Sequence, residues 1–165
     1  KMSASKYLIS LVEKISPARI GYAHCDIPCG IYDPHQAQIA ALSVIRMVQL
    51  IEDLDDSNSA ENQNKLSRFI AVKEESAEQA KSELRVLWGD YFKPEHLEEY
   101  PDLHNLFFSA MKQGSQVRQS VNLQAAETFL ATVQDIAEIF WKTKGANPSR
   151  QPSRQAVGGE IVYPG

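Results

Sequence analysis

Apolar residues recur at helical spacing in four segments of this 165-residue chain, and this periodicity constrains the fold more than any other feature. The first segment follows Asp33-Pro34, a helix start with aspartate as the cap and proline in the first helical position, and runs to about residue 55. The others cover about residues 60–87, 101–114 and 120–144. No segment predicts a strand of any length. The pattern predicts an all-α protein, an antiparallel up-and-down four-helix bundle.

Polar, glycine and proline residues mark the expected helix ends. Residues 55–59 form a polar turn, Trp88-Gly89-Asp90 breaks the second helix and Pro94 begins the next turn. Pro101 opens the third helix, and Gly114-Ser115 ends it. We expect the apolar stripes to form core rather than a cofactor pocket. Their members are Ile39, Leu42, Ile45, Val48, Leu50, Ile51, Leu54, Leu66, Phe69, Ile70, Ala77, Ala80, Leu84, Leu87, Leu103, Leu106, Phe107, Ala110, Met111, Leu123, Phe129, Leu130, Val133, Ile136, Ala137 and Phe140.

Both cysteines of the chain lie in one short stretch, residues 24–34, just before the first predicted helix. Three residues separate Cys25 from Cys29, so this is not a C-x-x-C redox motif, and two thiolates are too few for a closed zinc site. A cut between Ala23 and His24 would add an α-amine, with a pKa of roughly 7.7–8.0, to the imidazole, the Cys25 backbone nitrogen and the two thiolates. Nitrogen and thiolate donors in a flat arrangement suit nickel(II) or copper(II). We therefore predict a redox metal site in this stretch.

The stretch His24-Cys25-Asp26-Ile27-Pro28-Cys29-Gly30-Ile31-Tyr32-Asp33-Pro34 closely resembles the nickel hook of nickel superoxide dismutase. Three further blocks resemble segments of that family in the same order, and the resemblance covers roughly residues 24–145. The blocks are Leu87-Trp88-Gly89-Asp90-Tyr91-Phe92-Lys93-Pro94-Glu95-His96, Tyr100-Pro101-Asp102-Leu103-His104 and Ile139-Phe140-Trp141-Lys142-Thr143-Lys144.

The resemblance implies a nickel ion held by His24, Cys25 and Cys29. The equatorial ligands would be the His24 amine, the Cys25 backbone nitrogen and the two sulfurs, with the His24 imidazole as axial ligand. Nickel would cycle between Ni(II) and Ni(III) and disproportionate superoxide to dioxygen and hydrogen peroxide. The family also forms homohexamers with one nickel per processed subunit.

Four more residues take roles from the same resemblance. Tyr32 and Tyr91 match the tyrosines that flank the substrate approach. Asp26 matches a residue that helps to fix the hook, and Pro28 follows a peptide bond that is cis in the family. A cis bond before proline is plausible in a tight turn, because it costs only about 0.5–1 kcal/mol.

Two positions depart from the family pattern. Well-known members hold the axial imidazole with a glutamate and an arginine, where this chain has Ala40 and Ser76. A nickel storage or delivery protein with little turnover is therefore an alternative function. A third is a helical interaction module whose cysteines form a simple disulfide, although such a module needs neither His24 nor Tyr91.

The two ends of the chain are predicted to lie outside the bundle. Residues 1–23 read as a short amphipathic helix with a linker at Pro17, and the resemblance suggests a propeptide that a peptidase removes after Ala23; export is a weaker alternative. Residues 24–145 would form the bundle with its hook at 24–32. Residues 146–165 would form a flexible or surface-hugging tail that could dock on a neighbouring subunit. While residues 1–23 remain attached, His24 has no free amine and the enzyme would be inactive.

The charge of the chain constrains its partners. The net charge is −4, and removal of residues 1–23, which carry +3, leaves −7. This acidity argues against nucleic acid as a partner. No apolar run is long enough for a membrane span, and the cysteine content does not call for an extracellular disulfide framework, so we expect a cytoplasmic location.

Lys93 is the expected cation beside the site, or an ordinary solvated lysine. His35 could support the site or lie exposed, whereas His96 and His104 are expected to make structural hydrogen bonds.

Overall fold

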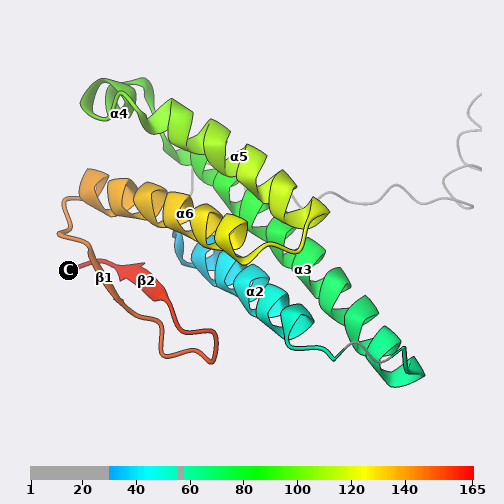
Figure 1. Ribbon diagram of the computed structural model, residues 1–165. Coiled ribbons are helices and arrows are strands. Elements are labelled where there is room, and N and C mark those ends of the chain that lie inside the picture. The colour runs from blue at the N-terminus through cyan, green and yellow to red at the C-terminus, as the bar shows by residue number, and fades with distance from the viewer. Residues whose placement is uncertain (1–29, 56–57) are drawn as a thin grey trace, which may run out of the picture.

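The computed structural model describes residues 30–55 and 58–165 of the chain. Four long helices run up and down beside one another: α2 (His35–Glu52), α3 (Ala60–Val86), α5 (Leu103–Gln119) and α6 (Leu123–Thr143) (Figure 1). Helix α2 packs on α3 and α6, and α5 packs on the same two helices from the other side. The predicted four-helix bundle is confirmed.

Local sequence explains where these helices begin. The Asp33 Oδ1 accepts a hydrogen bond from the His35 N–H at 2.7 Å, but Pro34 is the N-cap and α2 begins at His35, one residue later than predicted. Ser59 caps α3 and Asn122 caps α6, each accepting a hydrogen bond from a backbone N–H three residues later. The core is lined by predicted stripe residues such as Leu42, Leu84 and Phe129, whereas Leu66, in the first turns of α3, is 38% exposed.

The α-helix α3 ends at Val86, next to the expected break, but Trp88-Gly89-Asp90 does not interrupt the helical path of the chain. The helix instead widens into one π-helical turn, η1 (Leu87–Tyr91), before the chain becomes extended at Phe92 and enters the short helix α4 (Pro94–Glu99). Single π turns are rare and occur often at functional sites. This turn sets the position of Tyr91.

The expected helix end at Gly114-Ser115 is wrong, because α5 continues to Gln119. Gly114 is buried, and a Cβ atom placed on it would lie 2.7 Å from Lys81 Cγ and 3.3 Å from Phe129 Cζ. The missing side chain thus allows α5 to approach its neighbours closely, instead of ending the helix.

A buried lysine from α3 caps the C-terminal end of α5. Lys73 is 2% exposed, and its ammonium donates hydrogen bonds to the carbonyls of Val117, Arg118 and Ser120. The last carbonyls of a helix have no partner within the helix, and a positive charge there also suits the helix dipole. Lys73 on α3 therefore caps the C-terminus of α5.

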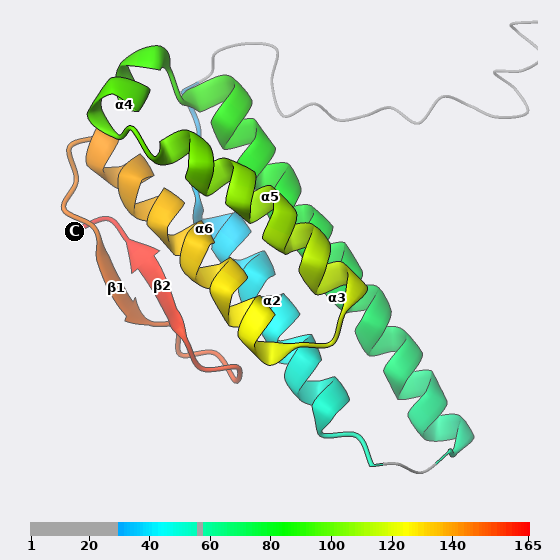
Figure 2. The same ribbon diagram turned by 45° about the horizontal axis from the view of Figure 1, so that its top comes forward.

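The C-terminal residues form an antiparallel β-hairpin that lies against α2 and α6 (Figure 2). Its strands are β1 (Ser149–Pro152) and β2 (Glu160–Tyr163), and Ile161 and Val162 are each only 1% exposed. The sequence indicated no strand here because β1 is exposed along its whole length and β2 has only two buried residues. The surface-hugging form of the predicted tail is the one observed.

Candidate functional site

Two tyrosines from distant parts of the chain meet at one end of the bundle. Tyr32 immediately precedes the start of α2, and Tyr91 closes the π turn after α3. Their ring centroids are 5.5 Å apart, with an angle of 54° between the planes. The two predicted gate residues therefore form a pair in the folded chain, which sequence spacing alone could not establish.

Aromatic neighbours and one hydrogen bond fix Tyr91. Its ring lies 4.5 Å from Phe140 and 5.1 Å from Phe92, centroid to centroid. Its hydroxyl lies 2.7 Å from Thr143 Oγ1, and the Thr143 hydroxyl donates to the Phe140 carbonyl. Because Thr143 has one hydroxyl hydrogen, Tyr91 is the donor in this pair. The Tyr91 oxygen keeps its lone pairs available to accept a hydrogen bond from water or substrate.

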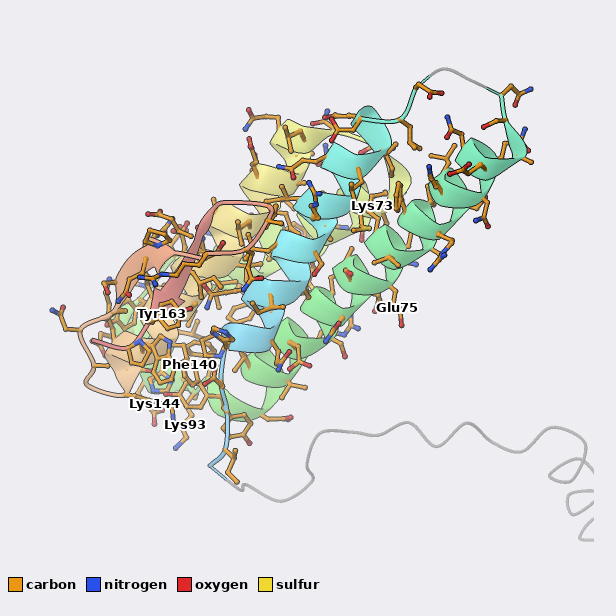
Figure 3. The ribbon with its side chains drawn as sticks, turned by 90° about the horizontal axis from the view of Figure 1, so that it is seen from below. Lys73, Glu75, Lys93, Phe140, Lys144 and Tyr163 are labelled. Atoms are coloured by element: carbon orange, nitrogen blue, oxygen red, sulfur yellow. The ribbon has the colours of Figure 1, made fainter. Side chains whose placement is uncertain are left out.

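A cation that the sequence did not single out lies over this aromatic group. Lys144 Nζ is 5.1 Å from the centroid of Tyr91 and 5.1 Å from that of Phe140, within the range of a cation–π contact. Lys93, the predicted cation, is exposed at the start of α4, where its backbone N–H donates to His96 Nδ1 at 3.1 Å. Figure 3 shows Lys93, Phe140 and Lys144 at the same end of the bundle. Lys144 is the C-cap of α6, directly after Thr143, and it belongs to the last block that resembles the family, which was the available signal in the sequence.

The predicted metal ligands His24, Cys25 and Cys29, together with Asp26 and Pro28, lie outside the described residues. Within residues 30–55 and 58–165, no group of three or more histidine, cysteine, aspartate or glutamate side chains could hold a metal ion. The donor set of the hook nevertheless fits nickel chemically, since it combines thiolates with an imidazole and an amine. The described chain begins at Gly30, one residue after Cys29, and leads directly into the Tyr32–Tyr91 pair.

The family model described as nickel-containing superoxide dismutase matches residues 19–144. This chain belongs to the nickel-containing superoxide dismutase family. The superoxide dismutase [Ni] of Streptomyces seoulensis is 43% identical over 124 residues, which cover 75% of this chain and 90% of that protein. The corresponding protein of Streptomyces coelicolor is 41% identical over the same length, with the same coverage.

Solved structures of nickel superoxide dismutases agree with the bundle. A native structure has a TM-score of 0.65 at 40% identity and covers 73% of this chain and 99% of its own. A structure with nickel ligation corresponding to the oxidised state has a TM-score of 0.68 at 42% identity, covering 74% of this chain and 100% of its own. The match to the family model ends at residue 144, so the hairpin of this nickel superoxide dismutase family member lies beyond the matched range.

The two positions that depart from the family pattern are buried. Ala40 on α2 is 3% exposed and Ser76 on α3 is 8% exposed. The two helices pack on each other, and these small side chains contribute to that packing without a carboxylate or a guanidinium. Neither residue can therefore take over the ionic contact expected at its position.

The remaining histidines make local contacts. His35 is half-buried and its ring lies 5.7 Å from Tyr163. His96 accepts the predicted structural hydrogen bond, from the Lys93 N–H, whereas the His104 ring lies 5.5 Å from Trp88 on the surface. No described helix is both long enough and apolar enough to cross a lipid bilayer.

Proposed function

We propose that this protein is a nickel-dependent superoxide dismutase that gains activity when the bond between Ala23 and His24 is cut. The observation that carries the proposal is the Tyr32–Tyr91 pair, whose ring centroids are 5.5 Å apart. The pair lies where the chain that follows Cys29 joins the bundle, and the chain belongs to the nickel-containing superoxide dismutase family. The family resemblance assigned a role to both tyrosines, and their proximity in the fold supports that assignment independently.

His24, Cys25 and Cys29 would hold the nickel through the His24 amine and imidazole, the Cys25 backbone nitrogen and the two sulfurs. The metal supplies one-electron chemistry between Ni(II) and Ni(III). Overall, two superoxide anions and two protons give one dioxygen and one hydrogen peroxide. One superoxide is oxidised and the other is reduced, so electrons balance without a further reductant.

The described residues would admit and orient the substrate. Lys144, held over the Tyr91 ring, gives local positive charge in an acidic protein and would attract a small anion near the site. The Tyr91 oxygen, whose hydrogen is committed to Thr143, can accept a hydrogen bond from a water that delivers a proton. The paired rings would exclude bulkier molecules, which protects the thiolates from oxidation.

The test is superoxide turnover per bound nickel, measured on the chain that begins at His24 and on the chain that carries residues 1–23. Fast turnover in the cut chain alone supports the amine-ligated nickel site and the propeptide. A Cys29→Ser variant of the cut chain is the matched control, and it should bind nickel weakly and show no turnover. Absence of nickel binding in both forms would refute the proposal and favour a disulfide-closed helical module.

A second function, nickel storage or delivery, is favoured by Ala40 and Ser76. Partners that orient a metal ligand commonly change affinity or activity by about 10–100-fold, and neither side chain supplies the carboxylate or guanidinium that the family has at its position. Tight nickel binding by the cut chain without turnover would select this function.

We also infer that the processed chain assembles as a homohexamer in the cytoplasm. Large apolar side chains on the surface support association, notably Ile31 at 76% and Phe108 at 58% exposure. Light scattering coupled to size-exclusion chromatography would give the mass of the assembly, and a monomer at micromolar concentration would contradict the hexamer.

A further inference from the structure

The outer edge of strand β2 is completed by two glutamine side chains in place of a third strand. Gln38 on α2 is fully buried; its Nε2 donates to the Val162 carbonyl at 3.3 Å, and its Oε1 accepts from the Val162 N–H at 2.7 Å. Gln134 on α6 donates from Nε2 to the Glu160 carbonyl at 2.7 Å. The Gln38 amide satisfies both backbone groups of the buried Val162, which would otherwise be left unpaired, and Gln134 binds the carbonyl of the exposed Glu160. The hairpin is therefore joined to both helices by specific bonds.

On the α6 side, the hairpin is anchored by charge as well. The Arg150 guanidinium on β1 donates to Asp135 at 2.6 Å, to Glu138 at 2.7 Å and to Gln134 Oε1 at 3.1 Å. A guanidinium held by three acceptors on one helix face has little freedom to move. Helix α6 thus serves as the fixed support of the hairpin.

On the α2 side, the hairpin contacts the first turns of the helix. The Tyr163 ring lies 5.7 Å from His35, the first residue of α2, and the Gln38 bonds to Val162 follow one turn later. Tyr163 is labelled in Figure 3 at the same end of the molecule as Phe140 and Lys144. The chain just before these contacts carries Tyr32.

Contacts with α6 therefore fix the positions of both tyrosines of the site. Tyr91 is bound directly, through Thr143 and Phe140. Tyr32 is tied through α2, which packs directly on α6 and whose first turns are also held by the hairpin that Arg150 anchors on α6. Loss of the α2–hairpin contacts would free the start of α2 to shift relative to Tyr91.

We propose that Gln38 and Tyr163 are positioning residues, which hold the start of α2 so that Tyr32, three residues after the predicted ligand Cys29, is presented in register with Tyr91. The inference rests on the proposed nickel superoxide dismutase function. It assigns a role to the C-terminal hairpin, which follows the range matched by the family model.

The experiment compares Gln38→Leu, Tyr163→Leu and the matched control Gln134→Leu, each in the chain that begins at His24 and ends at Gly165. Gln38 and Gln134 are both buried glutamines that anchor the hairpin, at 0% and 5% exposure, but only Gln38 lies on the helix that leads from the hook. Four quantities are measured: the nickel dissociation constant by chelator competition, amide hydrogen exchange of residues 35–41 by mass spectrometry, kcat and KM.

We expect Gln38→Leu to weaken nickel binding by about 10-fold, the lower end for residues that support metal ligands, and to speed exchange in residues 35–41. Tyr163→Leu should change both in the same direction and keeps the test available if Gln38→Leu does not fold. Gln134→Leu should lower thermal stability while leaving nickel affinity and KM unchanged, because Arg150 still holds the hairpin on α6 through Asp135 and Glu138.

Equal losses of nickel affinity in the Gln38 and Gln134 variants would overturn the inference, since they would indicate a general loss of stability. Unchanged affinity in the Gln38 and Tyr163 variants would overturn it as well. A parent chain that binds no nickel would overturn the proposed function together with this inference, and that failure is recognised before any variant is compared.

Discussion

Replacement of the buried Lys73 by methionine tests how strongly one helix depends on a capping group from another. The substitution keeps an unbranched apolar side chain of similar length, with sulfur in place of the δ-methylene, and removes the ammonium. The carbonyls of Val117, Arg118 and Ser120 then lose their common donor. Each hydrogen bond to a charged group contributes about 1.5–3 kcal/mol.

The three bonds do not add in full, because placing an ammonium in the interior has its own cost. Burial lowers the pKa of the Lys73 amine, which reflects this cost directly. The methionine variant avoids that penalty, and water reaches part of the exposed helix end. We expect a net loss of about 3 kcal/mol in the free energy of unfolding. For a chain of this size, this corresponds to a fall in Tm of about 6–12 °C.

The measurement is urea unfolding followed by far-UV circular dichroism and by tryptophan fluorescence, at one fixed protein concentration. The midpoint should fall while the slope with urea stays constant, because the surface exposed on unfolding is unchanged. Lys65→Met is the control: Lys65 pairs with Glu61 at the surface, its side chain is 46% exposed, and its loss should cost less than about 0.5 kcal/mol. A Lys73→Met variant as stable as the parent would refute the reasoning. The three hydrogen bonds would then only offset the free-energy cost of burying the ammonium.

Three further predictions follow from single side chains. Gly114→Ala should lower the free energy of unfolding by about 1–3 kcal/mol, since the new Cβ meets Lys81 and Phe129, and an unchanged urea midpoint would contradict the close approach. Lys144→Gln in the nickel-loaded cut chain should lower kcat/KM for superoxide and weaken its dependence on ionic strength, with Lys112→Gln, at the exposed Phe108 ring, as a control that changes neither. The hydrogen bond from Arg85 holds the pKa of Glu78 below its usual range, so Glu78 stabilises the fold above about pH 4.5 and loses this effect as the pH falls through its lowered pKa. Because its side chain is 43% exposed, Glu78→Gln should cost at most about 0.5–1 kcal/mol at pH 7 in urea unfolding and nothing near pH 2, and a difference that persists at pH 2 would exclude the carboxylate as its cause.

The helices were predictable from the sequence because their signals are local. The aspartate before Pro34 and the apolar periodicity place α2 within a few residues, and Ala60–Val86 agrees with the predicted second helix. Gly114 was misread because a glycine that ends a helix and one that admits a neighbouring helix look alike until the neighbour is placed. The π turn at Leu87–Tyr91 was missed for a similar reason, since Trp88-Gly89-Asp90 has the composition of a break.

The site and the hairpin depend on contacts between distant residues. The tyrosines were identified through the resemblance, but the position of Lys144 over Tyr91 requires the packing of α6 against the π turn. The hairpin is specified by Gln38 and Gln134, polar residues that interrupt apolar helix faces and whose purpose appears only when β2 lies beside them. A local pattern has no means of encoding such a pairing.

The bonds between Gln38 and Val162 also set an order for biosynthesis. These residues are 124 positions apart, so at about 5–20 residues per second a ribosome needs roughly 6–25 s after Gln38 to make its partner. Until then α2 carries a core amide with no acceptor or donor of its own, and the early helices cannot reach their final packing. The first turns of α2 therefore gain these bonds only after β2 has left the ribosome. Consequently, a chain truncated before Val162 would bury the Gln38 amide without these two hydrogen bonds.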